Sequence, residues 1–299
     1  MKTNNLRQNT FALIAALIWG TAFVAQSMAA ETVSAFAFNA ARSYVGGLVL
    51  IPVWLLFAKS RKNNPEAANW KKKDLLIGGI CCGSALFIAA YLQQKGLETT
   101  TAGKAGFITA LYIIIVPIFG LFLKKKAPKS VWLGVMLAVV GLYFLCINET
   151  VTIAAGDLYI VGCAFCFAGH ILTIDHFAPK VDIIAMSCIQ FFVTAVLSTV
   201  GALLWESQSW VGLEQALFPI LYVGVFSSGV AYTLQIFAQR GSNPTVISLL
   251  LSMESVFAVL AGAIILGDSL SGREYFGCLL VLLAVVLSQL PEKKEQIVK

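Results

Sequence analysis

Long apolar stretches separated by short polar ones run through the whole chain. An α-helix rises about 1.5 Å per residue, so about 20 apolar residues cross the roughly 30 Å hydrocarbon core of a bilayer. Lipid offers no hydrogen-bond partner to the backbone, and continuous apolar stretches satisfy that backbone only as helices. The pattern predicts an all-α membrane protein with ten transmembrane helices, at 10–30, 34–57, 75–94, 102–123, 131–147, 157–174, 183–204, 217–238, 245–266 and 274–290.

The first apolar stretch also has features of a signal peptide. Lys2 and Arg7 precede it, and Ser27-Met28-Ala29 is similar to a cleavage site. The stretch is long for the apolar region of a signal peptide, however, and it contains Trp19 and Gln26. We therefore expect it to be the first transmembrane helix of the mature protein.

The lysines and arginines predict the orientation of the ten helices. Positively charged loops stay on the cytoplasmic side. With a cytoplasmic N-terminus, 17 of the 21 Lys and Arg residues lie inside, and Lys95, Lys104 and Arg273 lie outside. We therefore expect both termini in the cytoplasm and the protein in the plasma or inner membrane.

Composition agrees with a membrane protein and indicates no cofactor. The 299 residues are 59% hydrophobic and 12% charged, about half the charged fraction of a soluble domain. The net charge of +6 is explained by the cytoplasmic loops, so the expected partners are membrane lipids and a small-molecule substrate, and not nucleic acid. Cys163 and Cys166 have CxxC spacing without a second ligand pair nearby, so we expect neither a metal site nor a disulfide framework.

The two halves of the chain are weakly similar to each other. Residues 109–142 align without gaps on 252–285, which places Gly134 on Gly277. With five helices in each half, the second copy must cross the membrane in the opposite sense to the first. We therefore predict two inverted five-helix repeats, at 1–147 and 148–299.

Several segments together resemble one transporter family. They are Ile18-Trp19-Gly20-Thr21, the segment 38–42 that ends in Arg42, the segment 96–112 followed by Pro117, and the segment 252–258 followed by Gly267-Asp268. In this order and spacing the whole chain resembles the EamA-type branch of the drug/metabolite transporter superfamily. Members usually have Pro where this chain has Ser255, and Glu where it has Asp268.

The resemblance implies a fold and a class of function. The expected fold is a ten-helix inverted repeat whose substrate path is lined largely by helices one, three, four, six, eight and nine. The expected function is export or exchange of small metabolites. The family's substrates range over amino acids, nucleobases, sugars and amphiphilic toxins, so the resemblance does not fix the substrate.

Two residues carry a formal charge inside the predicted membrane cores, Arg42 and Glu254. Charged groups at this depth are costly and usually face a protein interior or a water-filled path. Glu254 is a candidate contact for a cationic group or for an exchangeable proton, and Arg42 a candidate partner or coupling residue. A permanent Arg42–Glu254 ion pair, or an Arg42 satisfied by backbone carbonyls, is the structural alternative.

Other side chains at membrane depth are weaker candidates for the path. Aromatic faces and amides can stack on and hydrogen-bond a polar solute, and the candidates are Trp19, Tyr91, Tyr232 and Gln235. Thr21 and His170 occupy equivalent positions at an offset of 149 residues. Lys104 is a candidate coupling residue, with a lysine extended to the interface as the alternative.

Small residues and prolines indicate packing and bending. Gly79 and Gly83, and Gly224 with Ser228, are spaced for close helix contact. Pro117 removes a backbone hydrogen bond and is a candidate hinge.

The sequence contains no catalytic constellation. It has no Ser/His/Asp grouping, no HExxH and no P-loop glycine pattern. We therefore expect a non-enzymatic secondary transporter, a monomer driven by a solute gradient or by a gradient of protons or other ions. A flippase for lipid-linked groups and a scaffold or sensor without transport are the alternatives.

Overall fold

The computed structural model describes residues 2–57, 70–125, 127–146, 154–206, 210–266 and 270–288. Within these residues every regular element is helical, and the helices form ten segments in chain order. They are α1 (Lys2–Ala30), α2 (Ala35–Leu56), α4 (Lys72–Leu97), α5 (Ala102–Ala110) with α6 (Tyr112–Phe122), α7 (Lys129–Cys146), α8 (Ala155–Phe177) with η2 (Ala178–Lys180), α9 (Ile183–Trp205), α10 (Leu217–Tyr222) with η3 (Val223–Ala231) and α11 (Tyr232–Gln239), α12 (Pro244–Leu251) with α13 (Met253–Ala261) and η4 (Gly262–Leu266), and α14 (Gly272–Ser288).

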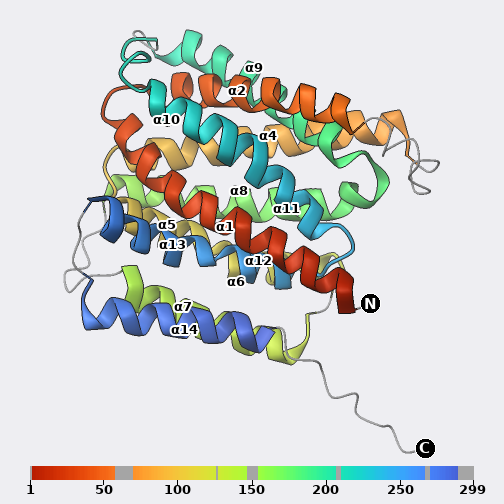
Figure 1. Cartoon of the computed structure of the whole chain (residues 1–299), viewed down its shortest axis with the longest axis vertical. Helices are drawn as coiled ribbons and strands as arrows, with labels where there is room; N and C mark the ends of the chain where they lie inside the picture. The colour runs from red at the N-terminus through yellow and green to blue at the C-terminus, as the bar shows by residue number, and fades with distance from the viewer. Residues whose placement is uncertain are drawn as a thin grey trace, which may run out of the picture.

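The prediction of an all-helical membrane protein with ten helices is confirmed. Eight segments are long and apolar enough to cross a bilayer. The fifth, Lys129–Leu145, is a shorter apolar helix, and α14 has 17 residues. The start of α1 and the end of α14 lie on the same side of the bundle (Figure 1).

Local sequence explains where several helices begin. The Asn243 side chain accepts a hydrogen bond from the backbone N–H of Thr245, and Pro244 occupies the first turn of α12. Asp182 accepts from the N–H groups of Ile184 and Ala185 at the start of α9. These caps satisfy N–H groups that a helix start leaves unpaired.

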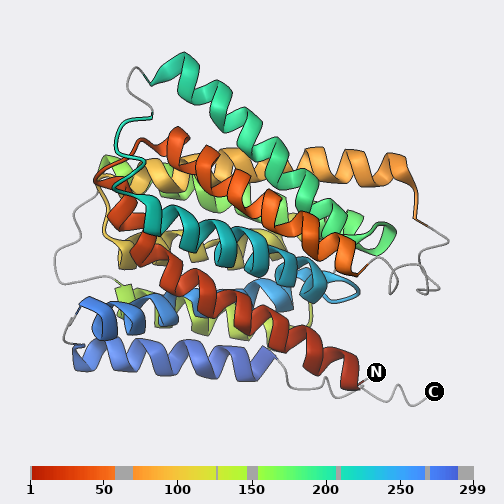
Figure 2. The ribbon, with the colours of Figure 1, turned by 45° about the horizontal axis from the view of Figure 1, so that its top comes forward.

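One helix pair forms a layer of its own. The helices α7 and α14 run side by side along one edge of the bundle, and α9 lies at the opposite edge (Figures 1 and 2). The backbones of α7 and α14 touch: a Cβ atom on Gly277 of α14 would lie 2.7 Å from the carbonyl oxygen of Gly141 of α7. The remaining helices pack between these edges and surround the molecule's centre.

A second close approach brings the first half of the chain against the second. Gly20 of α1 lies on α13, where a Cβ atom would be 2.5 Å from the Cβ of Phe257 and 2.8 Å from the carbonyl oxygen of Glu254. The absence of a side chain at Gly20 thus lets α1 contact the α13 backbone. This contact sets the position of Trp19 relative to Glu254.

Two transmembrane segments are interrupted near their middle. The helix α5 ends at Ala110 and α6 begins at Tyr112, and α12 ends at Leu251 and α13 begins at Met253. At both interruptions a backbone hydrogen bond joins residues three positions apart, as in a 3₁₀ turn: Ile114 N–H donates to Leu111 O, and Ser255 N–H donates to Ser252 O. The first interruption lies six residues before Pro117, and α6 continues through that proline.

A candidate solute site at the centre of the bundle

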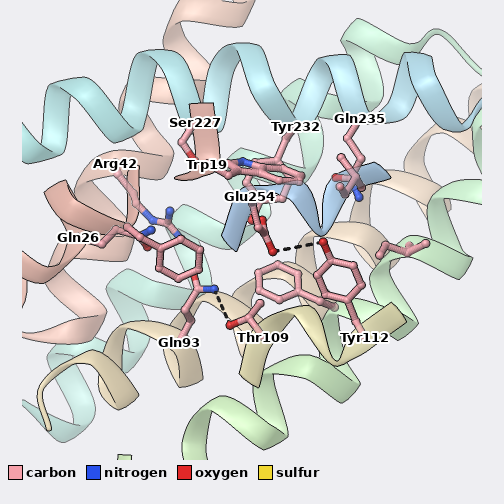
Figure 3. A pocket seen from close by; sticks show the side chains of 14 residues that line it. Trp19, Gln26, Arg42, Gln93, Thr109, Tyr112, Ser227, Tyr232, Gln235 and Glu254 are labelled. Atoms are coloured by element: carbon pink, nitrogen blue, oxygen red, sulfur yellow. Dashed lines mark hydrogen bonds between the residues drawn. The ribbon is translucent and has the colours of Figure 1, made fainter. Parts of the chain in front are cut away.

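A cavity lies where the interrupted helices meet α1 (Figure 3). The space between its lining side chains, counted with its open mouth, is about 450 Å³. The residues that line it are Trp19, Phe23, Gln26, Arg42, Gln93, Thr109, Tyr112, Phe167, Ile171, Ser227, Tyr232, Gln235, Leu251 and Glu254. They come from the six helices that the resemblance implies and from α2, which adds Arg42.

Glu254 supplies the negative charge of the cavity. It begins the second half of an interrupted segment and is 4% exposed. The Tyr112 hydroxyl, just after the other interruption, donates to its Oε1 at 3.2 Å, and Figure 3 shows the two side chains pointing toward each other. The interruptions of α5–α6 and α12–α13 thus place an acid and its hydrogen-bond donor at the same depth.

Arg42 supplies the positive charge. It is 4% exposed, and its Nε donates to Asn39 Oδ1 at 2.7 Å, while its guanidinium lies 5.7 Å from the Phe38 ring centre. Among the described residues no ion pair joins Arg42 to Glu254. The cavity therefore contains both charges without an ion pair between them.

Aromatic and amide groups line the space around the charges. The rings of Trp19 and Tyr232 meet edge to face with centroids 4.8 Å apart, and Gln93 Nε2 donates to Thr109 Oγ1 at 3.3 Å. Within the described part of the chain, three buried polar atoms of the lining have no hydrogen-bond partner: Trp19 Nε1, Gln26 Oε1 and Gln235 Oε1. Buried polar atoms without partners are uncommon and call for an explanation, and a polar solute would provide one.

A π-helical stretch shapes one wall. The nine residues of η3 separate α10 from α11, and they contain Ser227 and end directly before Tyr232. The π-helix is rare, and it occurs frequently at functional sites. Its wider turn sets which face of α11 carries Tyr232 and Gln235 toward the cavity.

Three of the predicted path residues lie outside this lining. The Thr21 hydroxyl lies 2.6 Å from that of Tyr222. Tyr91 stacks on Phe36 with ring centroids 4.0 Å apart. His170 is fully buried, and its Nε2 lies 3.2 Å from Gln190 Oε1.

The other predicted residues connect helices. Lys104 of α5 forms an ion pair with Asp157 of α8. A Cβ atom on Gly79 would lie 2.4 Å from Ile189 Cγ2, and one on Gly83 would lie 2.7 Å from the carbonyl oxygen of Gln190, so both glycines face α9. Gly224 meets Val45 of α2 in the same way. Pro117 is buried inside α6, and Gly267-Asp268 lies outside the described residues.

Sequence reasoning missed Tyr112, Thr109, Gln26 and Ser227 as lining residues. One signal was available, because Thr109 and Tyr112 align with Ser252 and Ser255 at the offset of 143 residues, and these two serines flank Glu254. The helix that carries the acid therefore has a counterpart at the same depth in the other half.

Comparison with known proteins agrees with the fold. The model of the EamA-like transporter family matches twice, at residues 7–147 and 154–290. An uncharacterized transporter of Archaeoglobus fulgidus is 32% identical over 278 residues, 93% of this chain and 84% of the relative. The uncharacterized transporter YwfM of Bacillus subtilis is 30% identical over 292 residues, 95% of each chain.

Two further similarities are more distant. The threonine/homoserine exporter RhtA of Escherichia coli is 27% identical over 297 residues, 95% of this chain and 91% of the exporter. A solved crystal structure has the same fold, with a TM-score of 0.77 and 20% identity over 94% of this chain and 96% of the other. The protein is a multi-pass membrane transporter and not an enzyme. It belongs to the EamA-like transporter family of the drug/metabolite transporter superfamily.

Proposed function

We propose that the protein is a secondary transporter that exports or exchanges small polar metabolites, amino acids among them, by alternating access. The observation that carries this proposal is the central cavity, because both halves of the chain line it. Trp19, Arg42 and Tyr112 come from the first half, and Tyr232 and Glu254 from the second. A site shared by two halves can open to either side when one half rocks against the other.

Several features support an inverted arrangement of the halves 1–147 and 148–299. Each half contains five helical segments, and an odd number reverses the direction of the second copy. The fourth segment of each half is interrupted beside the cavity, at Leu111 and at Ser252. Discontinuous helices at corresponding positions are a feature of transporter substrate sites.

The charges of the loops support a location for the protein, and a named relative supports a class of substrate. The excess of lysine and arginine in the loops assigned to the inside supports cytoplasmic termini in the plasma or inner membrane. A distant relative is named a threonine/homoserine exporter, which favours amino acids over nucleobases and sugars. That the central cavity is lined by residues of one chain supports a monomeric transport unit.

The first experiment measures exchange by the purified protein in liposomes. The vesicles contain labelled amino acids, nucleobases or polyamines, and exchange is followed for the native protein, for Glu254→Gln and for Glu98→Gln. We expect saturable exchange of amino acids and a loss of about tenfold or more in Glu254→Gln, the scale of a lost hydrogen bond to a charged group. Glu98 pairs with Lys95 near the end of α4, so Glu98→Gln should keep the native rate.

Two outcomes would contradict the proposal. One is monodisperse native protein that exchanges none of these solutes, which would favour the lipid-linked flippase or the scaffold. The other is Glu254→Gln protein with native exchange, which would remove Glu254 from the path.

The same assay tests whether Glu254 exchanges a proton. Tyr112 and Tyr232 line the cavity with Glu254 and Arg42, and Cys163 lies within electrostatic range of the carboxyl group. If the carboxyl group releases a proton when a substrate binds, the native exchange rate depends on pH and the Glu254→Gln rate does not. A pH dependence that is unchanged in the variant would assign coupling to another group.

A further inference from the structure

We infer that the cavity recognises zwitterions, with a substrate carboxylate on Arg42 and a substrate ammonium on Glu254. This inference rests on the proposed function and assigns the two ends of its substrate. It starts from two buried charges of opposite sign that line one cavity without an ion pair between them. Buried charges are costly unless they are paired, and a zwitterion supplies the missing partner of each.

The Arg42 end is suited to a carboxylate. Asn39 accepts the bond from Nε and thereby fixes the plane of the guanidinium. The terminal nitrogens have no hydrogen-bond partner among the described residues. A planar guanidinium with free terminal N–H groups binds a carboxylate through two parallel hydrogen bonds.

The Glu254 end is suited to an ammonium group. Tyr112 donates to Oε1, and within the described part of the chain Oε2 accepts no hydrogen bond. Figure 3 shows the carboxylate beside Trp19, whose ring meets that of Tyr232. Aromatic faces next to a carboxylate attract cations, so this end binds a cation by charge and by ring contact.

Uncharged polar groups complete the lining. Gln26 and Gln235 are 4% and 2% exposed, and each has an amide oxygen without a partner in the described structure. These oxygens accept bonds from an ammonium or from a hydroxyl, and Trp19 Nε1 can donate one. The lining contains one acid and one base, so an amine or an acid alone leaves one of the two charges unpaired.

The test compares three solutes that differ by one charged group. L-Threonine carries both groups, 1-amino-2-propanol lacks the carboxylate, and 3-hydroxybutyrate lacks the ammonium. Each competes with labelled L-threonine for exchange into liposomes that contain the native protein, Arg42→Gln or Glu254→Gln. Arg273→Gln and Glu98→Gln are the matched controls, because both residues lie outside the cavity lining.

The two variants are expected to change selectivity in opposite directions. In native protein and in both controls, each analogue should compete about tenfold or more weakly than L-threonine. Arg42→Gln should make L-threonine compete no better than 1-amino-2-propanol, and Glu254→Gln should make it compete no better than 3-hydroxybutyrate. These ratios do not depend on the fraction of folded protein, so a loss of yield does not mimic them.

Each contrary result has its own meaning. If 1-amino-2-propanol or 3-hydroxybutyrate competes for exchange by the native protein as well as L-threonine does, the zwitterion inference is wrong. It is also wrong if either variant keeps the native ratios. In both cases the proposed transport function is unaffected. Exchange of nucleobases or polyamines but of no amino acid also overturns it. If the native protein exchanges no solute at all, the proposed function fails first.

Discussion

Replacing Gly20 by alanine is expected to destabilise the protein by about 1–3 kcal/mol, the usual cost of overpacking a close contact. The new Cβ atom would lie 2.8 Å from two backbone atoms of α13, Ala258 N and Glu254 O. Backbone atoms inside a helix cannot move aside as a flexible side-chain end can, so α1 must separate from α13. The midpoint of thermal unfolding in detergent measures the loss.

Gly169 is the matched control for this substitution. It occupies the equivalent position in the second half, at an offset of 149 residues, and a Cβ atom there would meet no other atom within 4 Å. Alanine within a helix is favoured over glycine by roughly 0.5–1 kcal/mol, so Gly169→Ala should leave the midpoint unchanged or raise it. Equal losses in the two variants would show that the α1–α13 contact is not the cause.

The second large effect is expected at Asp157. This buried carboxylate accepts hydrogen bonds from Lys104 Nζ, Thr100 Oγ1 and the backbone N–H of Ala154, and it thereby joins α5 of the first half to α8 of the second. Hydrogen bonds to a charged group are each worth about 1.5–3 kcal/mol. Asp157→Asn is therefore expected to destabilise the protein by about 2 kcal/mol or more, measured by the same thermal unfolding.

A double-mutant cycle separates the ion pair from the other bonds. The double variant Lys104→Met/Asp157→Asn should lose less stability than the two single variants added together, because each single change already removes the same ion pair. The Lys95–Glu98 pair, with side chains 37% and 29% exposed, is the control, since exposed pairs contribute roughly 0–1 kcal/mol. Additive effects at Lys104 and Asp157 would show that the pair contributes nothing to holding the halves together.

The sequence was sufficient to predict the helices, and the two charged residues that it singled out line the central cavity. Arg42 and Glu254 are charged residues within apolar stretches, and because burial of a charge is costly in any membrane, both were expected to face a polar interior. Both line the same cavity. Trp19, Tyr232 and Gln235 were chosen for their chemistry at membrane depth, and they also line it.

The faces of the helices could not be predicted in the same way. In α8 the exposed Leu158 and the buried Ile160 are equally apolar, because lipid and protein interior both accept such side chains. No periodicity therefore indicates which side of α8 or α4 faces the cavity. This is why His170 and Tyr91 were grouped with path residues although neither lines the cavity. His170 lies behind the lining residue Tyr232, with ring centroids 5.9 Å apart, and Tyr91 stacks on Phe36.

The helix interruptions also lie beyond what the sequence shows. Tyr112 reaches Glu254 because α6 begins anew after Leu111. Pro117 indicated a bend in this segment, but the break depends on how α5 and α6 pack against their neighbours. Local sequence cannot specify such packing by itself.

The π-helical stretch η3 makes one wall of the cavity depend on how its own residues are wound. A wider turn holds more residues than an α-helical turn, so loss of one residue from Val223–Ala231 would restore ordinary α-helix. Because the wider turn already absorbs the extra residue, such a loss would leave α11 facing as it does now. Rewinding the stretch as α-helix at its present length would instead rotate everything after it by about 100°, the angle between successive residues at 3.6 per turn. Tyr232 and Gln235 would then leave the cavity wall and their neighbours would replace them. A shift between the two windings would therefore exchange the side chains that a solute meets, while the lipid-facing surface of the other helices stays intact.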